Sequence, residues 1–156
     1  MATSRNVQYI GKDATGTTIN DSDLSSRRQV EGFIAGAAIA AGEWVILDTS
    51  ATGSLKACTV IKATADTALP VVGCALTAAT AAGDVIQVVV RGYHATAYVG
   101  VSLTAGISLG ATAATHAAGQ VVAYSQATAT VPPCGVLLVS TDGSTTSAPV
   151  YVSGVF

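Results

Sequence analysis

One five-residue segment of the sequence has the spacing of a catalytic nucleophile. Gly106-Ile107-Ser108-Leu109-Gly110 matches the G-x-S-x-G pattern, in which a serine attacks a carbonyl carbon from a strand–turn–helix elbow. That chemistry also needs an acid and a histidine placed beyond the serine, and His116 is the only histidine downstream. The flanking residues are mostly Ala and Thr. We therefore interpret the match as a coincidence in a chain rich in Gly and Ser.

The other residues that could do chemistry are too scattered to form a recognisable site. Asn20 to Asp23 offers the oxygen ligands that calcium prefers, but it lacks the Gly and the distal Glu of a calcium loop, which favours a solvated turn. Gly11 to Gly16 has the wrong residue order for a phosphate-binding loop. His94 and His116 have no metal-ligand spacing, and we expect His94 at the surface or at an interface. The sequence predicts no enzyme, catalytic residue, cofactor, metal or small-molecule substrate.

The cysteines and apolar segments add no further chemistry. Cys58, Cys74 and Cys134 are widely spaced and form no C-x-x-C pair. We expect buried, reduced thiols, which suit a reducing cytoplasm. No apolar run approaches the roughly 18 residues that a membrane-spanning helix needs.

Charge is concentrated at the start of the chain. The first 31 residues carry half of all the charged side chains, four basic and four acidic. Charged residues make up 10% of the whole sequence, against about 25% in ordinary soluble domains. The net charge of −2 offers no basic surface for nucleic acid. Because a lone globule with so few charges would be poorly soluble, we expect much of its surface to be buried in an assembly.

The body of the chain has the pattern of an all-β domain. A phrase of Ala, Gly and a polar residue, followed by an extended apolar run, begins at Ala41, Ala82 and Ala118. Gly supplies a tight turn and the β-branched run that follows forms a strand. We predict a compact β-barrel or sandwich of about eight to ten short strands. They cover residues 29–34, 44–48, 55–59, 71–76, 85–91, 93–98, 121–124, 136–140 and 150–155.

Two features lie outside these strands. Strand signals fade over residues 102–118, where a helical turn or short helix is expected. Pro132-Pro133 predicts an extended turn.

A longer internal repeat runs through the body. Gly73 to Gly92 and Gly135 to Gly154 have the same length, and Val88-Val89-Val90-Arg91-Gly92 aligns with Val150-Tyr151-Val152-Ser153-Gly154. In both copies the first and third residues of the strand are Val and would face the core. The matched length and register predict two related strand pairs.

Residues 1–31 are predicted to be an extended N-terminal arm, and residues 32–156 the folded domain. The arm has one short alternating segment, Val7-Gln8-Tyr9-Ile10, and then mostly Thr, Asp, Ser and Gly. A lone strand needs the open edge of a neighbouring sheet to pair its backbone groups. Pairing of this kind with another subunit would be β-augmentation. Arg27 and Arg28 either pair with acidic groups of a partner or are solvated. The predicted partner contacts of the arm are therefore Val7, Tyr9, Ile10, Arg27 and Arg28.

Aromatic residues are rare, so each is a candidate anchor for a core or an interface. Only 5% of the residues are aromatic. The candidates in the body are Phe33, Trp44 and Phe156; Trp44 follows a turn and is expected in the core.

Several short motifs resemble one family of viral proteins. Ala35 to Leu47, Val72 to Leu76, and Ala81 to Val85 continuing through Val90-Arg91-Gly92 are similar to the head decoration, or capsid cement, proteins of tailed bacteriophages. The resemblance covers about residues 30–156. It implies a β-barrel-like domain, often trimeric, that sits outside the capsid and clamps neighbouring copies of the major capsid protein. It also implies assembly in the bacterial cytoplasm and brings no catalytic residue.

Two other interpretations stay open from the sequence. The chain could be another virion subunit, such as a head fibre, tail tube or spike. An enzyme or carbohydrate-binding domain would instead need a pocket with convergent acids or aromatics, for which the sequence gives no pattern.

Overall fold

The computed structural model describes residues 28–64, 69–111, 117–126 and 131–154. The predicted all-β class is confirmed, because these residues form nine strands and one short 3₁₀-helix. No helix among them is long and apolar enough to cross a membrane. The elements are β1 (Gln29–Ala35), β2 (Trp44–Leu47), the 3₁₀-helix (Gly53–Ala57), β3 (Thr59–Lys62), β4 (Val71–Ala75), β5 (Val85–Tyr98), β6 (Ser108–Gly110), β7 (Val122–Ala123), β8 (Gly135–Leu137) and β9 (Ser147–Ser153).

The first five strands close into a small barrel. Their order around it is β1, β3, β2, β4 and the first half of β5, which pairs back onto β1. Within this barrel, only the pairing of β1 with β3 is parallel. The interior is filled by buried apolar side chains, mostly small or β-branched, as a five-stranded barrel requires. They include Phe33, Ile39, Val45, Val60, Val72, Ile86, Val88 and Val90.

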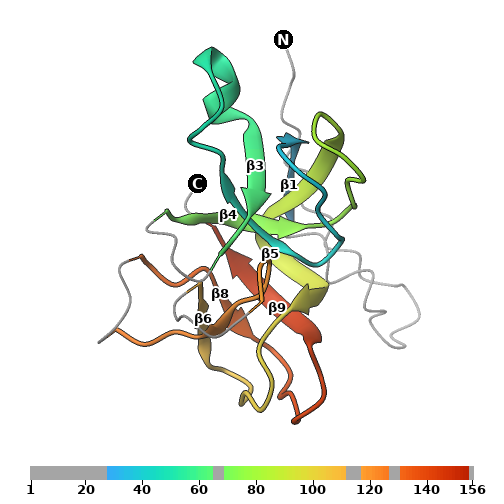
Figure 1. Cartoon of the computed structure of the whole chain (residues 1–156). Coiled ribbons are helices and arrows are strands. Elements are labelled where there is room, and N and C mark those ends of the chain that lie inside the picture. Colours follow the sequence, from blue (N-terminus) through green and yellow to red (C-terminus); the bar gives the residue numbers. More distant parts are fainter. Residues whose placement is uncertain (1–27, 65–68, 112–116, 127–130, 155–156) are drawn as a thin grey trace, which may run out of the picture.

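The second half of β5 continues into a second set of strands. There β5 pairs with β9, and β8, β6 and β7 follow in the sheet. A parallel bridge between Val99 and Val121 joins the end of β5 to the start of β7. In Figure 1 the first unit lies above and the second below, with β5 running between them.

The two units have the same strand order and share β5. Cys74 pairs with Val89 in the first unit, and 62 residues later Val136 pairs with Tyr151 in the second. The repeat predicted from the sequence is therefore confirmed in the register of the strands. Interior residues correspond with the same spacing and are all buried: Val72, Ala75, Ile86, Val88 and Val90 match Cys134, Leu137, Ala148, Val150 and Val152.

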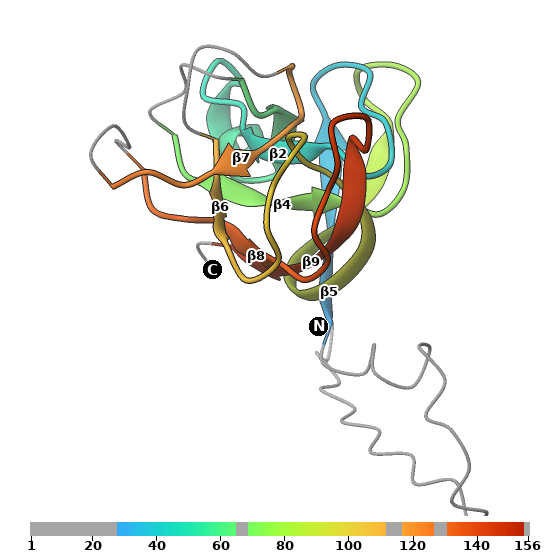
Figure 2. The same cartoon turned by 90° about the horizontal axis from the view of Figure 1, so that it is seen from below.

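A shared core joins the units. Trp44 is fully buried in a cluster that also holds Leu109 and Val150 of the second unit. Its indole Nε1 donates a hydrogen bond of 2.9 Å to the Tyr98 carbonyl. A Cβ added at Gly135 would lie 3.1 Å from the Trp44 ring, so the ring fits against a position without a side chain. Viewed from the side of the second unit, β2 and β4 lie behind β6, β8 and β9 (Figure 2).

Several boundaries differ from the sequence predictions. The strand expected at residues 55–59 is a 3₁₀-helix followed by β3, because the Cys58 N–H bonds back to Leu55 and closes a turn. The strands expected at residues 85–91 and 93–98 are one strand, in which Gly92 takes a φ of 107° that other residues rarely adopt. In the described part of residues 102–118 there is no helix; Gly106 makes a turn and β6 pairs with β8.

Candidate interaction surfaces

Among the described residues, β1 has one edge that is largely unpaired, close to the point where the N-terminal segment joins the fold. From Gln29 to Ile34, β1 pairs with β5, whereas its other edge meets β3 only at Ile34 and Ala35. The Ala35 N–H bonds to the Asp84 carbonyl at the start of β5, and the Ile34 N–H bonds to Cys58 on the other side. The backbone N–H groups of successive residues point to opposite sides of a strand. The N–H groups of Val30 and Gly32 therefore point to the same side as that of Ile34.

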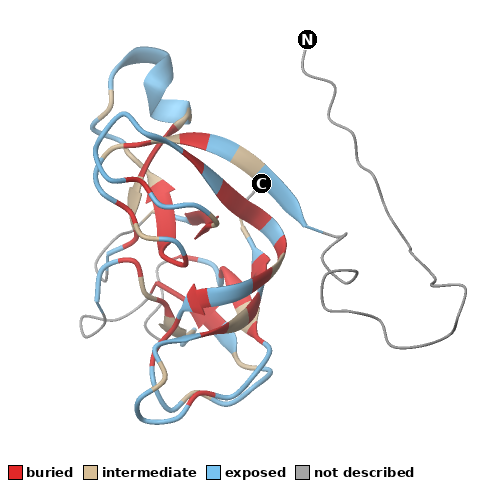
Figure 3. Ribbon diagram, turned by 90° about the vertical axis from the view of Figure 1, so that its right-hand side faces the viewer, coloured by how far each residue is buried: buried red, intermediate tan, exposed pale blue. Residues whose placement is uncertain are grey.

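No strand in the described ranges pairs with this side of Gln29–Phe33, which we call the β1 edge. Val30 and Gly32 are exposed, and a side chain at Gly32 would meet open space. Figure 3 shows the exposed start of β1 where the chain enters. Unpaired N–H and C=O groups on an exposed edge are a template for another strand.

Of the five predicted arm contacts, Arg28 alone lies within the described residues. It is exposed and directly precedes β1. Gln29 to Glu31, where the predicted arm (1–31) overlaps the predicted strand (29–34), belong to β1. The Gln29 side-chain amide donates 2.8 Å to the Glu31 carboxylate. Val7, Tyr9, Ile10 and Arg27 lie outside the described residues.

A second surface lies on the outer face of the second unit. Tyr151 is 38% exposed, and Tyr93, its direct neighbour on β5, is partly exposed. Inward-facing residues of β9 alternate with outward-facing ones, so the face is regular. Four direct neighbours across β6, β8, β9 and β5 form what we call the tyrosine row: Ser108, Val136, Tyr151 and Tyr93.

The aromatic candidates of the body occupy different places. Phe33 is buried inside the first barrel and Trp44 in the core between the units. Both therefore anchor the core, and neither is accessible to a partner. Phe156 lies outside the described residues. Tyr93 and Tyr151 were not singled out from the sequence, although strand alternation in the repeat places Tyr151 on the outward face.

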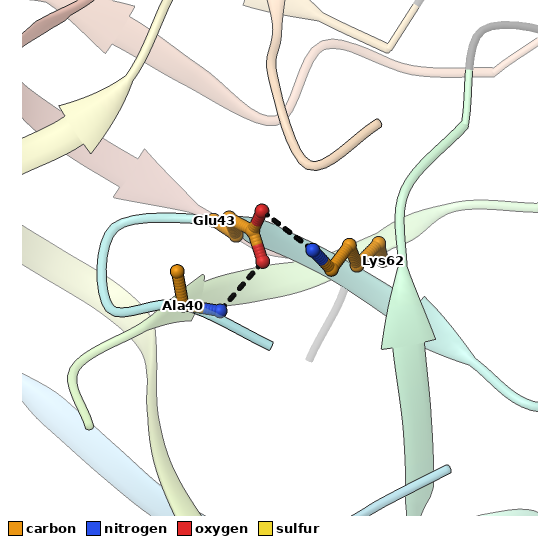
Figure 4. A network of polar contacts seen from close by, with 3 residues as sticks. All are labelled: Ala40, Glu43 and Lys62. Atoms are coloured by element: carbon orange, nitrogen blue, oxygen red, sulfur yellow. Dashed lines mark hydrogen bonds and ion pairs between the residues drawn. The ribbon is translucent and has the colours of Figure 1, made fainter. Parts of the chain in front are cut away.

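One buried carboxylate ties three segments together. Glu43 is nearly inaccessible, and its two oxygens accept 2.6 Å from the Ala40 N–H and 2.8 Å from the Lys62 ammonium (Figure 4). A Cβ at Gly119, which has a φ of 80°, would contact the Glu43 side chain. The carboxylate thus links the turn before β2 to the end of β3, and the Glu43 side chain lies close to the Gly119 backbone of the second unit. Its sequence signal was an acid between Gly42 and Trp44 in an apolar run.

His94 was expected at the surface or at an interface, and that expectation is wrong. Its side chain is buried, and its Nε2 lies 3.1 Å from the Ala75 carbonyl. The Thr96 N–H donates to Nδ1, so Nε2 carries the proton and donates to Ala75. Burial lowers the pKa of His94, the Ala75 bond opposes this, and the positive charge of Arg28 lowers it further. The imidazole is therefore held in its neutral form.

The cysteines are free thiols in different surroundings. Cys74 and Cys134 are buried, whereas Cys58 is half-buried. Burial raises the pKa of Cys134 to about 12 and also raises that of Cys74. Both buried thiols therefore stay protonated at neutral pH and behave as small apolar side chains.

The G-x-S-x-G serine lies in a strand. Ser108 is the first residue of β6, pairs with Val136 and is exposed at the end of the tyrosine row. No helix follows it within the described residues, which end at Ala111 before resuming at Ala117. His116 lies outside them. Groups of three or more His, Cys, Asp or Glu side chains suited to a metal are also absent from the described part of the chain.

Comparisons with known proteins give a structural likeness and no sequence match. No protein-family model and no curated protein sequence matches this chain. One solved structure, the head fibre gp8.5 N base of bacteriophage phi29, aligns with a TM-score of 0.49 and 14% identity, over 81% of this chain and 94% of that one. At this level the likeness assigns no function to the present chain.

Proposed function

We propose that this chain is a structural protein of a bacteriophage virion that binds the outside of the assembled capsid and stabilises it. The observation that carries the proposal is the β1 edge, whose backbone groups pair with no strand of the described ranges and which includes exposed Val30 and Gly32. It lies directly after the charge-rich N-terminal segment, beside exposed Arg28. A strand of the major capsid protein that pairs with this edge would bind by β-augmentation.

The sequence supports the same role. Its motifs resemble those of head decoration proteins, and its body is poor in charge. In this proposal the arm contacts neighbouring capsid subunits, and copies of the chain assemble, as a trimer, in the host cytoplasm. In such a trimer several weak contacts with the capsid act together. The affinity of the trimer for the capsid is then higher than that of one copy, although each copy makes no new contact.

Another virion subunit, such as a head fibre, tail tube or spike, remains the alternative. Tube-forming subunits polymerise on their own, whereas a decoration protein stays a small oligomer. The size of the purified protein therefore separates these roles.

Removing residues 1–27 tests the proposal, because the truncation ends before β1. We expect the truncated protein to keep its fold and to lose most of its binding to capsids assembled from the cognate major capsid protein. Binding is measured by co-sedimentation, and folding by circular dichroism and thermal unfolding. Unchanged capsid binding by the folded truncation would contradict the arm's role, and no binding by the full chain would contradict the proposal itself.

A further inference from the structure

The glycine on the β1 edge is not required by the described fold. Gly32 lies inside β1 with a φ outside the left-handed range, so its backbone conformation is open to other residues. A Cβ added there would meet no atom within 4 Å. The irregularity of the β1–β5 ladder lies between Gln29 and Val30, so Gly32 marks no bulge. Glycine inside a strand lowers stability, because it loses more conformational freedom on folding than any other residue.

Two other strand glycines have a reason within the fold. A Cβ added at Gly73 would clash with the Val89 carbonyl oxygen, and one at Gly135 would clash with the Tyr151 carbonyl oxygen. In both places the backbone of a neighbouring strand approaches too closely for a side chain. Close approach of another group is a common reason for glycine inside a strand. At Gly32 the described residues provide no such group, which points to a partner.

Apolar side chains surround the open space above Gly32. Val30 and Ile34 lie two residues to either side of it and therefore point to the same face of the strand. Val30 is exposed and Ile34 is half-buried. On β5, Gln87 pairs with Gly32 and Val85 pairs with Ile34. Val85 is 74% exposed, the highest value among the large apolar side chains in the described ranges.

A strand paired with the β1 edge would direct a side chain into this space. The residue opposite Gly32 would have its side chain on the face of Val30 and Ile34, because directly paired residues share a face. Since Gly32 has no side chain, the partner's side chain could lie across β1 and reach Val85 on β5. Diagonal neighbours of this kind, about 7–8 Å apart, are within reach of aromatic and long side chains.

We propose that the capsid strand that pairs with the β1 edge has a large apolar side chain opposite Gly32. This side chain lies over the glycine, between Val30 and Ile34 and against Val85. The inference rests on the proposed function and adds the chemistry of the partner: an extended segment that fits along Gln29–Phe33 and carries a bulky apolar residue. A large side chain held in a matching space is the usual anchor of an interface.

Gly32→Val in the full chain tests the inference, because valine keeps the backbone N–H and fills the space. Its side chain would meet no described atom and β-branched residues favour strands, so the variant should unfold at a higher temperature than the wild type. It should nevertheless bind capsids assembled from the cognate major capsid protein about tenfold more weakly. Gly32→Ala is the matched control, because one methyl group leaves most of the space open, and it should bind like the wild type. Binding is measured by co-sedimentation and stability by thermal unfolding.

Val85→Asp tests the apolar surroundings without changing β1. Its side chain is 74% exposed, so the substitution is compatible with the fold. A charge there should weaken capsid binding, whereas Val139→Asp, at a position 52% exposed in the second unit, should not. Equal binding by these two variants would contradict the inference.

The outcomes separate this inference from the proposed function. Suppose that capsid binding is weakened by Gly32→Pro, which lacks the edge N–H, and is unchanged by folded Gly32→Val. The strand pairing would then stand, and the side chain over Gly32 would be refuted. A lower unfolding temperature for Gly32→Val would place the close neighbour within the chain itself and would also overturn the inference. No capsid binding by the wild-type chain would overturn both proposals.

Discussion

His94 shows how one buried base makes stability depend on pH. Its ring accepts a hydrogen bond at Nδ1 and donates one from Nε2, a pattern that only the neutral form can make. Burial lowers its pKa in the folded protein, below the value near 6.5 of an unfolded chain. The unfolded state therefore binds a proton more readily, and acid favours unfolding.

We expect the free energy of unfolding to fall as the pH decreases from 7.5 to 5.5, by up to about 1.4 kcal/mol per pH unit once His94 protonates in the unfolded chain alone. His94→Gln should flatten this dependence, as measured by urea unfolding at several pH values. Hydrogen bonds lower the pKa of Asp48, Asp84 and Asp142, so these carboxylates lose their contribution only in more acidic solution. Equal slopes for wild type and variant would contradict the role of His94.

At the scale of elements, β1 and β5 are strands whose pairing partners change along their length. β5 is shared because its first half pairs with β1 and β4, and its second half pairs with β9. β1 is paired on one side and, from Gln29 to Phe33, open on the other among the described residues. The open side is what allows this strand to receive another one.

Substitutions at Gly32 test whether the β1 edge contributes to capsid binding. The Gly32 N–H faces the open side, and a Cβ there would meet open space. Gly32→Pro should remove one edge donor, keep the β1–β5 ladder and weaken capsid binding, since proline is tolerated where the N–H faces away from the sheet. Gly32→Ala keeps the donor and should bind normally. The binding ratio of the two variants is measured by co-sedimentation with capsids. Equal binding by both folded variants would show that the edge makes no backbone pairing.

For the molecule as a whole, the core between the units predicts one cooperative unfolding transition. Trp44 of the first unit is buried among residues of the second, and Glu43 contacts Lys62 while its side chain closes over Gly119. Neither unit can lose its structure without exposing the core of the other. Two related units thus behave as one domain.

Trp44 is the single tryptophan, so its fluorescence reports on the junction. We expect its urea transition to coincide with the loss of β-structure measured by circular dichroism. Ile86→Ala in the first unit and Leu109→Ala in the second, both fully buried, should each cost about 2–5 kcal/mol. Each should shift both signals together. Separate transitions, or a shift of one signal alone, would show that the units unfold independently.

The all-β class, most strand positions and the internal repeat could be predicted from the sequence alone. Alternation along Val88-Val89-Val90 and Val150-Tyr151-Val152 is a local property of the pleat, and the identical register of the two copies follows from their equal length. The glycine turn before β2, with Gly42 at a φ of 90°, was also visible locally. Local chemistry sufficed for these features because each depends on neighbours in the chain.

Which outward faces are covered could not be predicted in this way, because it depends on how distant segments pack. Val89 and Tyr151 occupy equivalent positions, yet Val89 is fully buried because the second unit packs over it, whereas Tyr151 is 38% exposed. Burial of His94 and Trp44 likewise depends on Ala75 and Gly135, which lie far away in sequence. Strand alternation sets which side a residue faces; contacts between distant segments determine whether that side meets water.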